Sequence, residues 1–224
     1  MRIIASIKKG EEVRFISHLD LQRSLQRTVR RAGLPVSFSQ GFNPHPLISF
    51  ATALSVGQTG DGEWIEIKLD NDMSTDEFTR RMNENFPEGM SVTAAYIARE
   101  GTPSVASLME SAEYSAVCSG VDAETLLCAI NEVMSGDSIM VTKSKKQNGK
   151  KVKDAEVDLK PMLYDFAVVS VKDGTVKVRA KGRLDSAGGL NMELLLRAIN
   201  NTAGIDVPWR ICREKINLIR NAEL

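Results

Sequence analysis

The strongest constraint on the fold is an amphipathic helix with clear start and stop signals. Ser17, with Asp20 three residues later, has the spacing of a capping box, and Gly33 is a typical helix stop. At 100° per residue, the apolar side chains between these signals fall on one face and four arginines on the opposite face. Residues 2–8 are rich in β-branched side chains, so we expect a strand followed by a helix over residues 18–32.

The segments after this helix complete a regular order of elements. Alternating or β-branched stretches predict strands, and Ser74 predicts the start of a second helix. The expected elements are strands at residues 35–39, 47–55, 63–69 and 90–97, and a helix at residues 75–85. The order β-α-β-β-α-β is that of the split-βαβ, ferredoxin-like plan, in which two helices cover one face of an antiparallel sheet.

The second half of the chain predicts the same order after a small, polar linker at residues 101–111. The halves share no residue-level identity, so the repeat rests on element order alone. An extra hairpin is expected around Asn148-Gly149, which is a two-residue turn signal. We therefore expect an α+β protein with two tandem ferredoxin-like domains, residues 1–100 and 112–224, the second carrying the extra basic hairpin.

Charge is distributed unevenly along a chain whose totals balance at 29 Lys+Arg and 29 Asp+Glu. The first 40 residues hold eight Lys and Arg against three acids, and KSKKQNGKKVK at residues 143–153 places six lysines on the expected hairpin. Basic segments of this kind suit a polyanion such as RNA, whose binding would depend on salt. The alternative is an ordinary solvated surface with a solubilising loop.

The spacing of the cysteines bears on metal binding, and the apolar segments bear on the cellular location of the protein. Cys118, Cys128 and Cys212 are far apart and form no C-x-x-C pair, so we expect them to be apolar-type residues in a reducing compartment, with no metal and no cofactor. The first residues have no apolar signal region, and no run of 18 apolar residues occurs. The sequence therefore predicts a cytoplasmic protein with no membrane partner.

The segment SQGFNPHP, residues 39–46, is the most distinctive short stretch. Each residue before a proline is held out of the helical region, and Gly41 permits positive φ, so the loop is expected to be rigid. A rigid loop can present side chains at a small entropic cost, and we expect Phe42, Asn43 and His45 to contact RNA bases, with the two rings stacking on them. The alternative is that Phe42 folds inward and His45 only hydrogen-bonds the backbone.

Basic residues on the helix and the hairpin complete the expected RNA-binding set. Arginine suits phosphate recognition because its planar fork matches phosphate geometry. The residues expected to hold phosphates or steer the strand are Arg14, Arg23, Arg27, Arg30, Arg31, Lys143, Lys145, Lys146, Lys150 and Lys151.

Catalysis is the weaker interpretation of the same sequence. His18 or His45 could act as a general acid or base, which would make the chain a metal-independent endoribonuclease. Ser17 stands beside His18, but its simpler role is helix capping. No phosphate-binding loop, dinucleotide motif or metalloprotease motif occurs, so we assign no catalytic residues.

Residues 14–57 resemble a bacterial family known as radical-SAM-associated, or radical-SAM-linked, proteins. The resemblance is carried by Arg14-Phe15-x-Ser17-His18-x-Asp20, Arg30-Arg31-Ala32-Gly33 and Gly41-Phe42-Asn43-Pro44-His45-Pro46, with VDLKP at residues 157–161 as a further element. In that family the domain is often fused to, or encoded beside, a B12-binding radical SAM enzyme, frequently near an RNase gene. The resemblance implies a B12-type radical SAM enzyme as partner.

The leading hypothesis joins the two lines of argument. The three cysteines lack the close spacing that an iron–sulfur cluster of a radical SAM enzyme needs, so this chain would accompany such an enzyme. We expect a non-enzymatic, RNA-binding adaptor that presents RNA to the radical SAM partner. A protein-interaction module that docks on the enzyme through residues 39–46 is the other alternative.

Overall fold

The computed structural model describes residues 1–147 and 150–219. The chain folds into two compact units, and each is described by itself. The first unit contains Met1–Ala112, the short segment Asp185–Ala187 and the residues from Cys212 onward. The second unit contains Glu113–Leu184 and Gly188–Ile211.

The first unit is built on a mostly antiparallel sheet with the strand order β4-β1-β3-β2. The strands are β1 (Arg2–Lys9), β2 (Ile48–Phe50), β3 (Thr59–Lys68) and β4 (Met90–Ile97). Ala5 of β1 lies opposite Ile65 of β3 on one side and Ala95 of β4 on the other. The strand β11 (Arg210–Leu218) pairs with the start of β3 in parallel, with Cys212 opposite Thr59.

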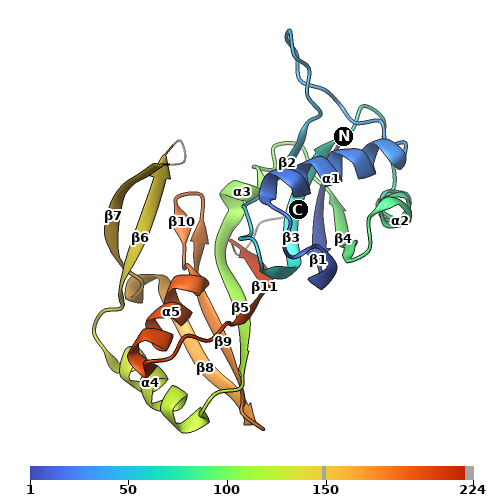
Figure 1. The fold of residues 1–224 in the computed structure, drawn as a ribbon. Coiled ribbons are helices and arrows are strands. Elements are labelled where there is room, and N and C mark those ends of the chain that lie inside the picture. Colours follow the sequence, from blue (N-terminus) through green and yellow to red (C-terminus); the bar gives the residue numbers. More distant parts are fainter. Residues whose placement is uncertain (148–149, 220–224) are drawn as a thin grey trace. The chain divides into compact units, whose positions relative to one another are not determined.

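Two helices cover one face of this sheet, α1 (His18–Arg31) and α2 (Thr75–Asn85) (Figure 1). Ser17 caps α1, because its Oγ accepts a hydrogen bond from the Asp20 amide at 3.2 Å, and Gly33 follows the helix at a φ of +61°. Leu21 and Leu25 of α1 and Phe78 of α2 are buried against the inward side chains of β1 and β3. Each fully buried side chain of this size stabilises the fold by about 1.5–3 kcal/mol.

The second unit combines strands, a separate hairpin and two helices that pack on each other. Asp122 and Asn191 cap the two helices through hydrogen bonds to the amides of Thr125 and Leu194. The elements are β5 (Met109–Ser119), α4 (Ala123–Ser135), β6 (Met140–Gln147), β7 (Lys150–Asp158), β8 (Leu163–Lys172), β9 (Thr175–Asp185), β10 (Gly188–Gly189) and α5 (Met192–Ala203). The strands β8 and β9 are antiparallel, and β6 and β7 form a two-stranded sheet of their own.

Short helical turns connect some of these elements. They are η1 (Glu11–Val13), α3 (Val105–Leu108) and η2 (Lys160–Met162). The segment expected as a linker, residues 101–111, therefore contains α3 and the start of β5. Val105 is buried and its amide donates to the Glu66 carboxylate at 2.7 Å, which holds α3 on the first unit.

The structure confirms a mixed α+β protein with a mostly antiparallel sheet, and the described residues contain five α-helices. Two ferredoxin-like domains remain a prediction. The strand expected at residues 35–39 is reduced to isolated bridges, and the one expected at residues 47–55 is only the short β2. Pro35, Pro44 and Pro46 lack the amide hydrogen that a strand ladder needs, which explains the irregular backbone here. The expected hairpin turn, Asn148-Gly149, lies outside the described residues.

Candidate functional site

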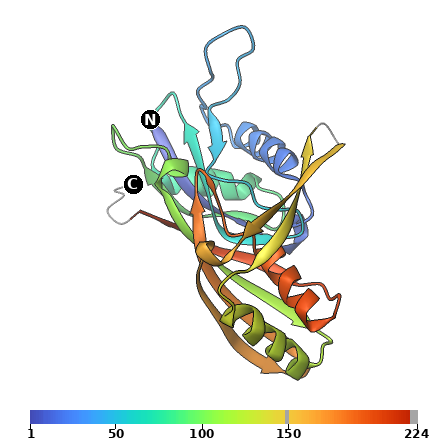
Figure 2. The same cartoon turned by 90° about the vertical axis from the view of Figure 1, so that its left-hand side faces the viewer.

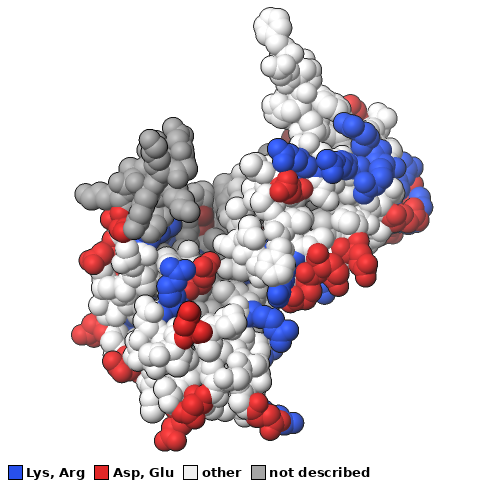
Figure 3. Space-filling model, in the orientation of Figure 1, with Lys and Arg blue, Asp and Glu red and all other residues white. Residues whose placement is uncertain are grey.

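A row of arginines runs along the outer face of α1. Arg23, Arg27 and Arg30 follow each other at helical spacing, and all three are exposed. Figure 3 shows Lys and Arg side chains gathered over α1. Arg23 pairs with Asp20 at 2.9 Å. Within the described part of the chain, Arg27 and Arg30 have no hydrogen bond or ion pair with another side chain. We call these three residues the arginine row, and two of its members are free to pair with an external anion.

The other two expected arginines of this region serve the protein itself. Arg14 is only partly exposed, pairs with Glu11 at 2.8 Å, and lies over the Phe15 ring with its guanidinium carbon 4.5 Å from the ring centroid. Arg31 donates a hydrogen bond to the Asn85 carbonyl oxygen at 2.6 Å and thereby ties α1 to the end of α2. The structure therefore groups three of the five arginines on one exposed face.

The loop of residues 39–45 projects from the first unit as a narrow protrusion (Figures 1 and 2). It contains no Lys, Arg, Asp or Glu, and Figure 3 shows it without charged side chains. Phe42 at its tip is fully exposed, so the inward orientation of this ring does not occur. Ser39 and His45 close the base of the loop, because the Ser39 amide donates to the His45 carbonyl oxygen at 2.9 Å. Asn43 is exposed on the same loop.

The side chain of Ser39 also fixes the ring of His45. Ser39 Oγ lies 2.8 Å from His45 Nδ1 and accepts a hydrogen bond from the His45 amide at 3.1 Å. The ring therefore pairs with a hydroxyl group rather than with the backbone, and its orientation is set before any ligand arrives. Phe42 and the arginine row belong to the same unit, joined by the short segment 32–38.

The expected basic hairpin belongs to the second unit. Its strands are β6 and β7, where Lys145 lies opposite Lys153 and Lys146 opposite Lys151 in the backbone register. Lys143 is exposed, and Lys150 begins β7. The side chains of residues 144–153 lie outside the described ones, so the lysines remain a prediction as an RNA contact.

His18 occupies a packed setting on α1. Its ring meets Phe50 of β2 edge-on, with the ring centroids 5.2 Å apart, and its Nε2 lies 3.2 Å from the side-chain nitrogen of Gln22. That amide nitrogen can only donate, so Nε2 accepts and the neutral ring carries its hydrogen on Nδ1. Nδ1 is buried with no partner among the residues described. Burial lowers the pKa of His18, although the Glu63 carboxylate opposes this shift, and the neutral ring packs as an apolar group.

A buried charge network at the start of α1 was not expected from the sequence. Lys9 is 1% exposed, and its ammonium group donates to the carbonyl oxygens of Arg14 at 2.9 Å and Gln58 at 3.1 Å. Burial lowers the pKa of Lys9, while Glu63 opposes the shift. These contacts fasten the segment before β3 to the residues that lead into α1. The alternation of β1 could have revealed Lys9, since it follows Ile3, Ala5 and Ile7 on the inward face.

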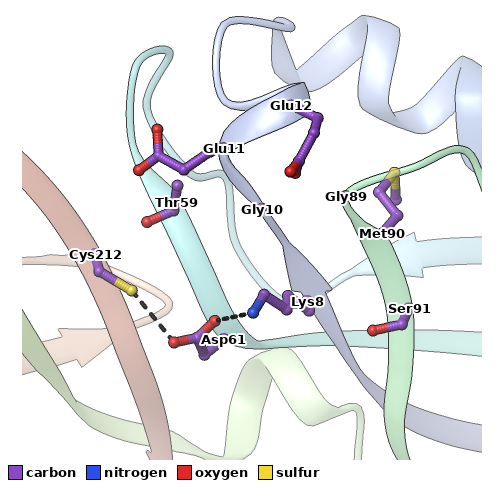
Figure 4. Close-up of a pocket in the computed structure, with 10 residues that line it drawn as sticks. All are labelled: Lys8, Gly10, Glu11, Glu12, Thr59, Asp61, Gly89, Met90, Ser91 and Cys212. Atoms are coloured by element: carbon purple, nitrogen blue, oxygen red, sulfur yellow. Dashed lines mark hydrogen bonds and ion pairs between the residues drawn. The ribbon is translucent and has the colours of Figure 1, made fainter.

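A second unexpected feature is an open pocket of about 410 Å³ at the end of β1 (Figure 4). Its chemistry is mainly acidic and hydroxylic, and its polar or charged lining residues are Lys8, Glu11, Glu12, Thr59, Asp61, Ser91 and Cys212. Asp61 accepts a hydrogen bond from Cys212 Sγ at 3.6 Å and lies 3.6 Å from Lys8 Nζ. Three carboxylates against one ammonium group make this pocket unsuited to a polyanion.

The glycines of this pocket allow two backbone segments to meet. The Gly10 amide donates to the Gly89 carbonyl oxygen at 2.7 Å, and a Cβ on either glycine would overlap the Glu12 carboxylate. Burial raises the pKa of the Cys212 thiol to about 11, so this group is protonated at neutral pH. Across residues 1–147 and 150–219, no three His, Cys, Asp or Glu side chains gather as a set of metal ligands.

The family relationship follows from residues 2–196, which match the model of a family described as "Uncharacterized protein conserved in bacteria (DUF2344)". The chain belongs to the DUF2344 family. The match covers the arginine row, the loop of residues 39–45 and the β6–β7 hairpin, whereas β11 lies beyond the matched residues. The DUF2344 description names no activity, substrate or partner. No curated protein matches the sequence.

Two solved structures align with most of this DUF2344 protein. A chain of the "Crystal Structure of a Cbf5-Nop10-Gar1 Complex" aligns with a TM-score of 0.52 and 10% sequence identity, over 96% of this chain and 48% of the other. A chain of the "Structure of H/ACA RNP bound to a substrate RNA containing 2'-deoxyuridine" aligns with a TM-score of 0.46 and 11% identity, over 94% and 46%. The DUF2344 chain spans about half the length of each. At this identity the first likeness shows the fold alone.

One further property concerns membranes. Among the described residues of the DUF2344 chain, no helix is both long enough and apolar enough to cross a membrane.

Proposed function

We propose that this DUF2344 protein binds single-stranded RNA through its first unit and works as a non-enzymatic adaptor for a B12-type radical SAM enzyme. The observation that carries the RNA proposal is the exposure of Phe42 on an uncharged, proline-braced loop, in the same unit as the arginine row. A fully exposed phenylalanine loses its contact with water when it stacks on a base, and this contributes to binding without sequence preference.

In this proposal, the arginine row supplies the electrostatic attraction for the RNA phosphates. From Arg23 to Arg30 the row spans about 10 Å along the helix axis, and Arg27 and Arg30 form no ion pair or hydrogen bond with a carboxylate within the described chain, although Arg27 still interacts electrostatically with Asp20. Guanidinium groups that are already exposed and unpaired bind phosphate without breaking an internal ion pair. Phosphates on the row and bases on the loop require unpaired nucleotides, since duplex bases are stacked and cannot reach Phe42.

The test is the salt dependence of RNA affinity. Fluorescence anisotropy of a labelled single-stranded RNA of about 12 nucleotides gives the dissociation constant between about 50 and 200 mM salt. Replacing Arg27 and Arg30 by glutamine should reduce the slope of log K against log salt by about 1.4, because each phosphate contact in a single strand contributes about 0.7.

The matched control is Arg80→Gln on α2. Arg80 is as exposed as the row, but Glu77 and Glu84 already neutralise it at 2.8 Å. This variant should bind RNA as the wild type does. An unchanged salt slope in the Arg27 and Arg30 variant, or no RNA binding at about 50 mM salt, contradicts the proposal.

The adaptor role rests on the resemblance of residues 14–57 to radical-SAM-associated proteins. Its test is a pull-down of a purified B12-type radical SAM enzyme with and without nuclease. Enzyme that stays bound after nuclease treatment contacts this chain directly, and enzyme that is released was bridged by RNA. Absence of the enzyme from both samples contradicts the adaptor role. It says nothing about RNA binding, which the salt dependence of the affinity tests independently.

The endoribonuclease alternative gains no support from the setting of His18, whose ring packs against Phe50. A cleavage assay with His18 and His45 both replaced by alanine separates it from simple binding. Loss of cleavage in that variant would favour the enzyme over the adaptor.

A further inference from the structure

A second hollow lies at the root of the projecting loop, and we call it the loop-root pocket. It encloses about 340 Å³ and is lined by Arg2, Lys68, Glu66 and His45, with Pro46 and Leu47 as apolar lining. A volume of this size is within the range of small-ligand sites. The pocket lies within the first unit.

The pocket faces away from the arginine row. Arg2 precedes Ile3 on β1 and Lys68 lies between Ile67 and Leu69, and these apolar neighbours face the helices. Successive side chains of a strand point to opposite faces, so Arg2 and Lys68 stand on the face that α1 and α2 do not cover. The pocket is therefore a surface separate from the arginine row.

Two cations stand directly opposite each other in this pocket. Arg2 and Lys68 are register partners on β1 and β3. Such side chains lie about 5 Å apart at Cβ, and like charges placed this way repel. Lys68 has no ion pair within the described residues, so no internal carboxylate relieves this repulsion on its side.

The other charged groups hold the site in place. Arg2 donates to the carbonyl oxygens of Thr102 and Pro103 and lies 3.8 Å from the Glu66 carboxylate. Glu66 also accepts a hydrogen bond from the Val105 amide at 2.7 Å. The carboxylate is thus already engaged by one hydrogen bond and one ion pair, and the guanidinium group of Arg2 is fixed before a ligand binds. Two positive charges against one negative charge remain around the hollow.

His45 adds a ring of fixed orientation. Its Nδ1 pairs with Ser39 Oγ, which leaves Nε2 available. Because a protonated ring, or a neutral ring with Nδ1 as acceptor, carries a hydrogen on Nε2, this atom can donate to an anion. Pro46 and Leu47 beside it offer apolar surface to a flat ring.

We propose that the loop-root pocket binds a nucleoside monophosphate group, with the phosphate between Arg2 and Lys68 and the nucleoside against His45 and Pro46. An anion between the two cations relieves their repulsion, and the apolar lining explains why the hollow is larger than a phosphate needs. The group is either a free nucleotide or the 5′-terminal nucleotide of an RNA. This site does not depend on the arginine row, so it can exist whether or not the proposed function holds.

The test is isothermal titration calorimetry of the whole protein with uridine 5′-monophosphate. Uridine alone and inorganic phosphate alone are titrated in the same way for comparison. The nucleotide should bind at least about tenfold more tightly than either fragment, because each fragment fills only part of the pocket.

Lys68→Met should weaken binding of the nucleotide about tenfold. Lys215→Met, an exposed lysine of β11 in the same unit, should leave it unchanged. Absence of nucleotide binding, equal affinity for phosphate and nucleotide, or no effect of Lys68→Met overturns the inference.

The source of the group is decided by comparing one RNA with a 5′-phosphate and with a 5′-hydroxyl. Tighter binding of the phosphorylated form, lost in Lys68→Met, identifies the RNA end as the ligand. Equal binding of both forms, together with uridine 5′-monophosphate binding, identifies a free nucleotide. If the RNA does not bind but the nucleotide does, the proposed function fails and the pocket stands.

Discussion

Arg213 of β11 and Glu63 of β3 form a buried ion pair, in which Arg213 Nε donates to Glu63 Oε1 at 2.8 Å. Both side chains are almost completely enclosed, and Arg213 also donates to the Ala53 carbonyl oxygen at 3.3 Å. The pair joins the only parallel strand of the first unit's described sheet to its neighbour and anchors the segment between β2 and β3.

Replacing Glu63 by leucine should lower the free energy of unfolding by about 3–5 kcal/mol, because an uncompensated guanidinium group would remain in the interior. Urea denaturation at neutral pH measures the loss. The double variant Glu63→Leu with Arg213→Met should recover part of it, since the uncompensated guanidinium group is gone, while the buried Lys9 ammonium still lacks the Glu63 carboxylate. A single variant that loses less than about 1 kcal/mol would show that water reaches the pair.

His18 should make stability depend on pH. Its pKa is lowered by burial, so at pH values below about 6.5 the unfolded chain binds a proton before the folded chain does. Stability therefore falls as the pH drops below that value, until the folded form is also protonated. His18→Phe should flatten the urea midpoint between about pH 7.5 and 5.5. An identical pH slope in this variant would assign the dependence to other groups.

Gly89 should tolerate no side chain, for two separable reasons. Its φ is +82°, and a Cβ would overlap the Glu12 carboxylate. Gly101 has the same φ of +82° with nothing within 4 Å of a Cβ, so Gly101→Ala measures the backbone strain alone. Thermal unfolding should show a loss of about 1–2 kcal/mol for Gly101→Ala and a clearly larger loss for Gly89→Ala. Equal losses would mean that Glu12 moves aside freely.

The three cysteines should differ in reactivity. Cys128 is exposed, whereas Cys118 is buried and burial raises its pKa. The pKa of Cys212 is raised to about 11, which leaves about one thiolate in a thousand at pH 8. Mass spectrometry after brief alkylation of the folded protein should find the label on Cys128. Equally rapid labelling of Cys212 would contradict its burial beside Asp61.

Phe42→Ala should weaken RNA binding without affecting stability. Loss of a stacking ring costs about 1–3 kcal/mol, which corresponds to about a 5- to 150-fold weaker affinity. The comparison variant is Tyr164→Ala, because Tyr164 is an aromatic residue of the second unit that is 53% exposed. Fluorescence anisotropy with single-stranded RNA should show a weaker affinity for Phe42→Ala than for Tyr164→Ala. Equal affinities would mean that Phe42 does not contact the RNA.

Local signals predicted the helices well. The expected start and end of α2 agree with the structure, and Ser17 and Ser74 cap helices as expected. Asp122 and Asn191 cap α4 and α5 in the same way. A cap acts on the amide groups two or three residues away, so a short window of sequence contains the whole interaction.

Pairings between residues far apart in the chain could not be predicted from the sequence. Nothing in residues 210–218 indicates that β11 pairs in parallel with β3, since the partner lies about 150 residues earlier. The charge of Arg213 likewise gave no sign that Glu63 would neutralise it in the interior. Of the candidate site, the loop sequence left open whether Phe42 would be exposed or folded inward, and the structure has it exposed. The loop-root pocket depends on the register of Arg2 with Lys68, which only the folded sheet reveals.

The position of β11 has a consequence for synthesis on the ribosome. Since this strand enters the first unit at Cys212, after the entire second unit in the chain, the nascent first unit emerges with the start of β3 unpaired on the side of β11 and Glu63 without its cation. Its sheet is completed only after translation of the second unit. Folding of the two units is thereby coupled in time, and a nascent chain arrested before Arg213 should be more sensitive to proteases than the finished one.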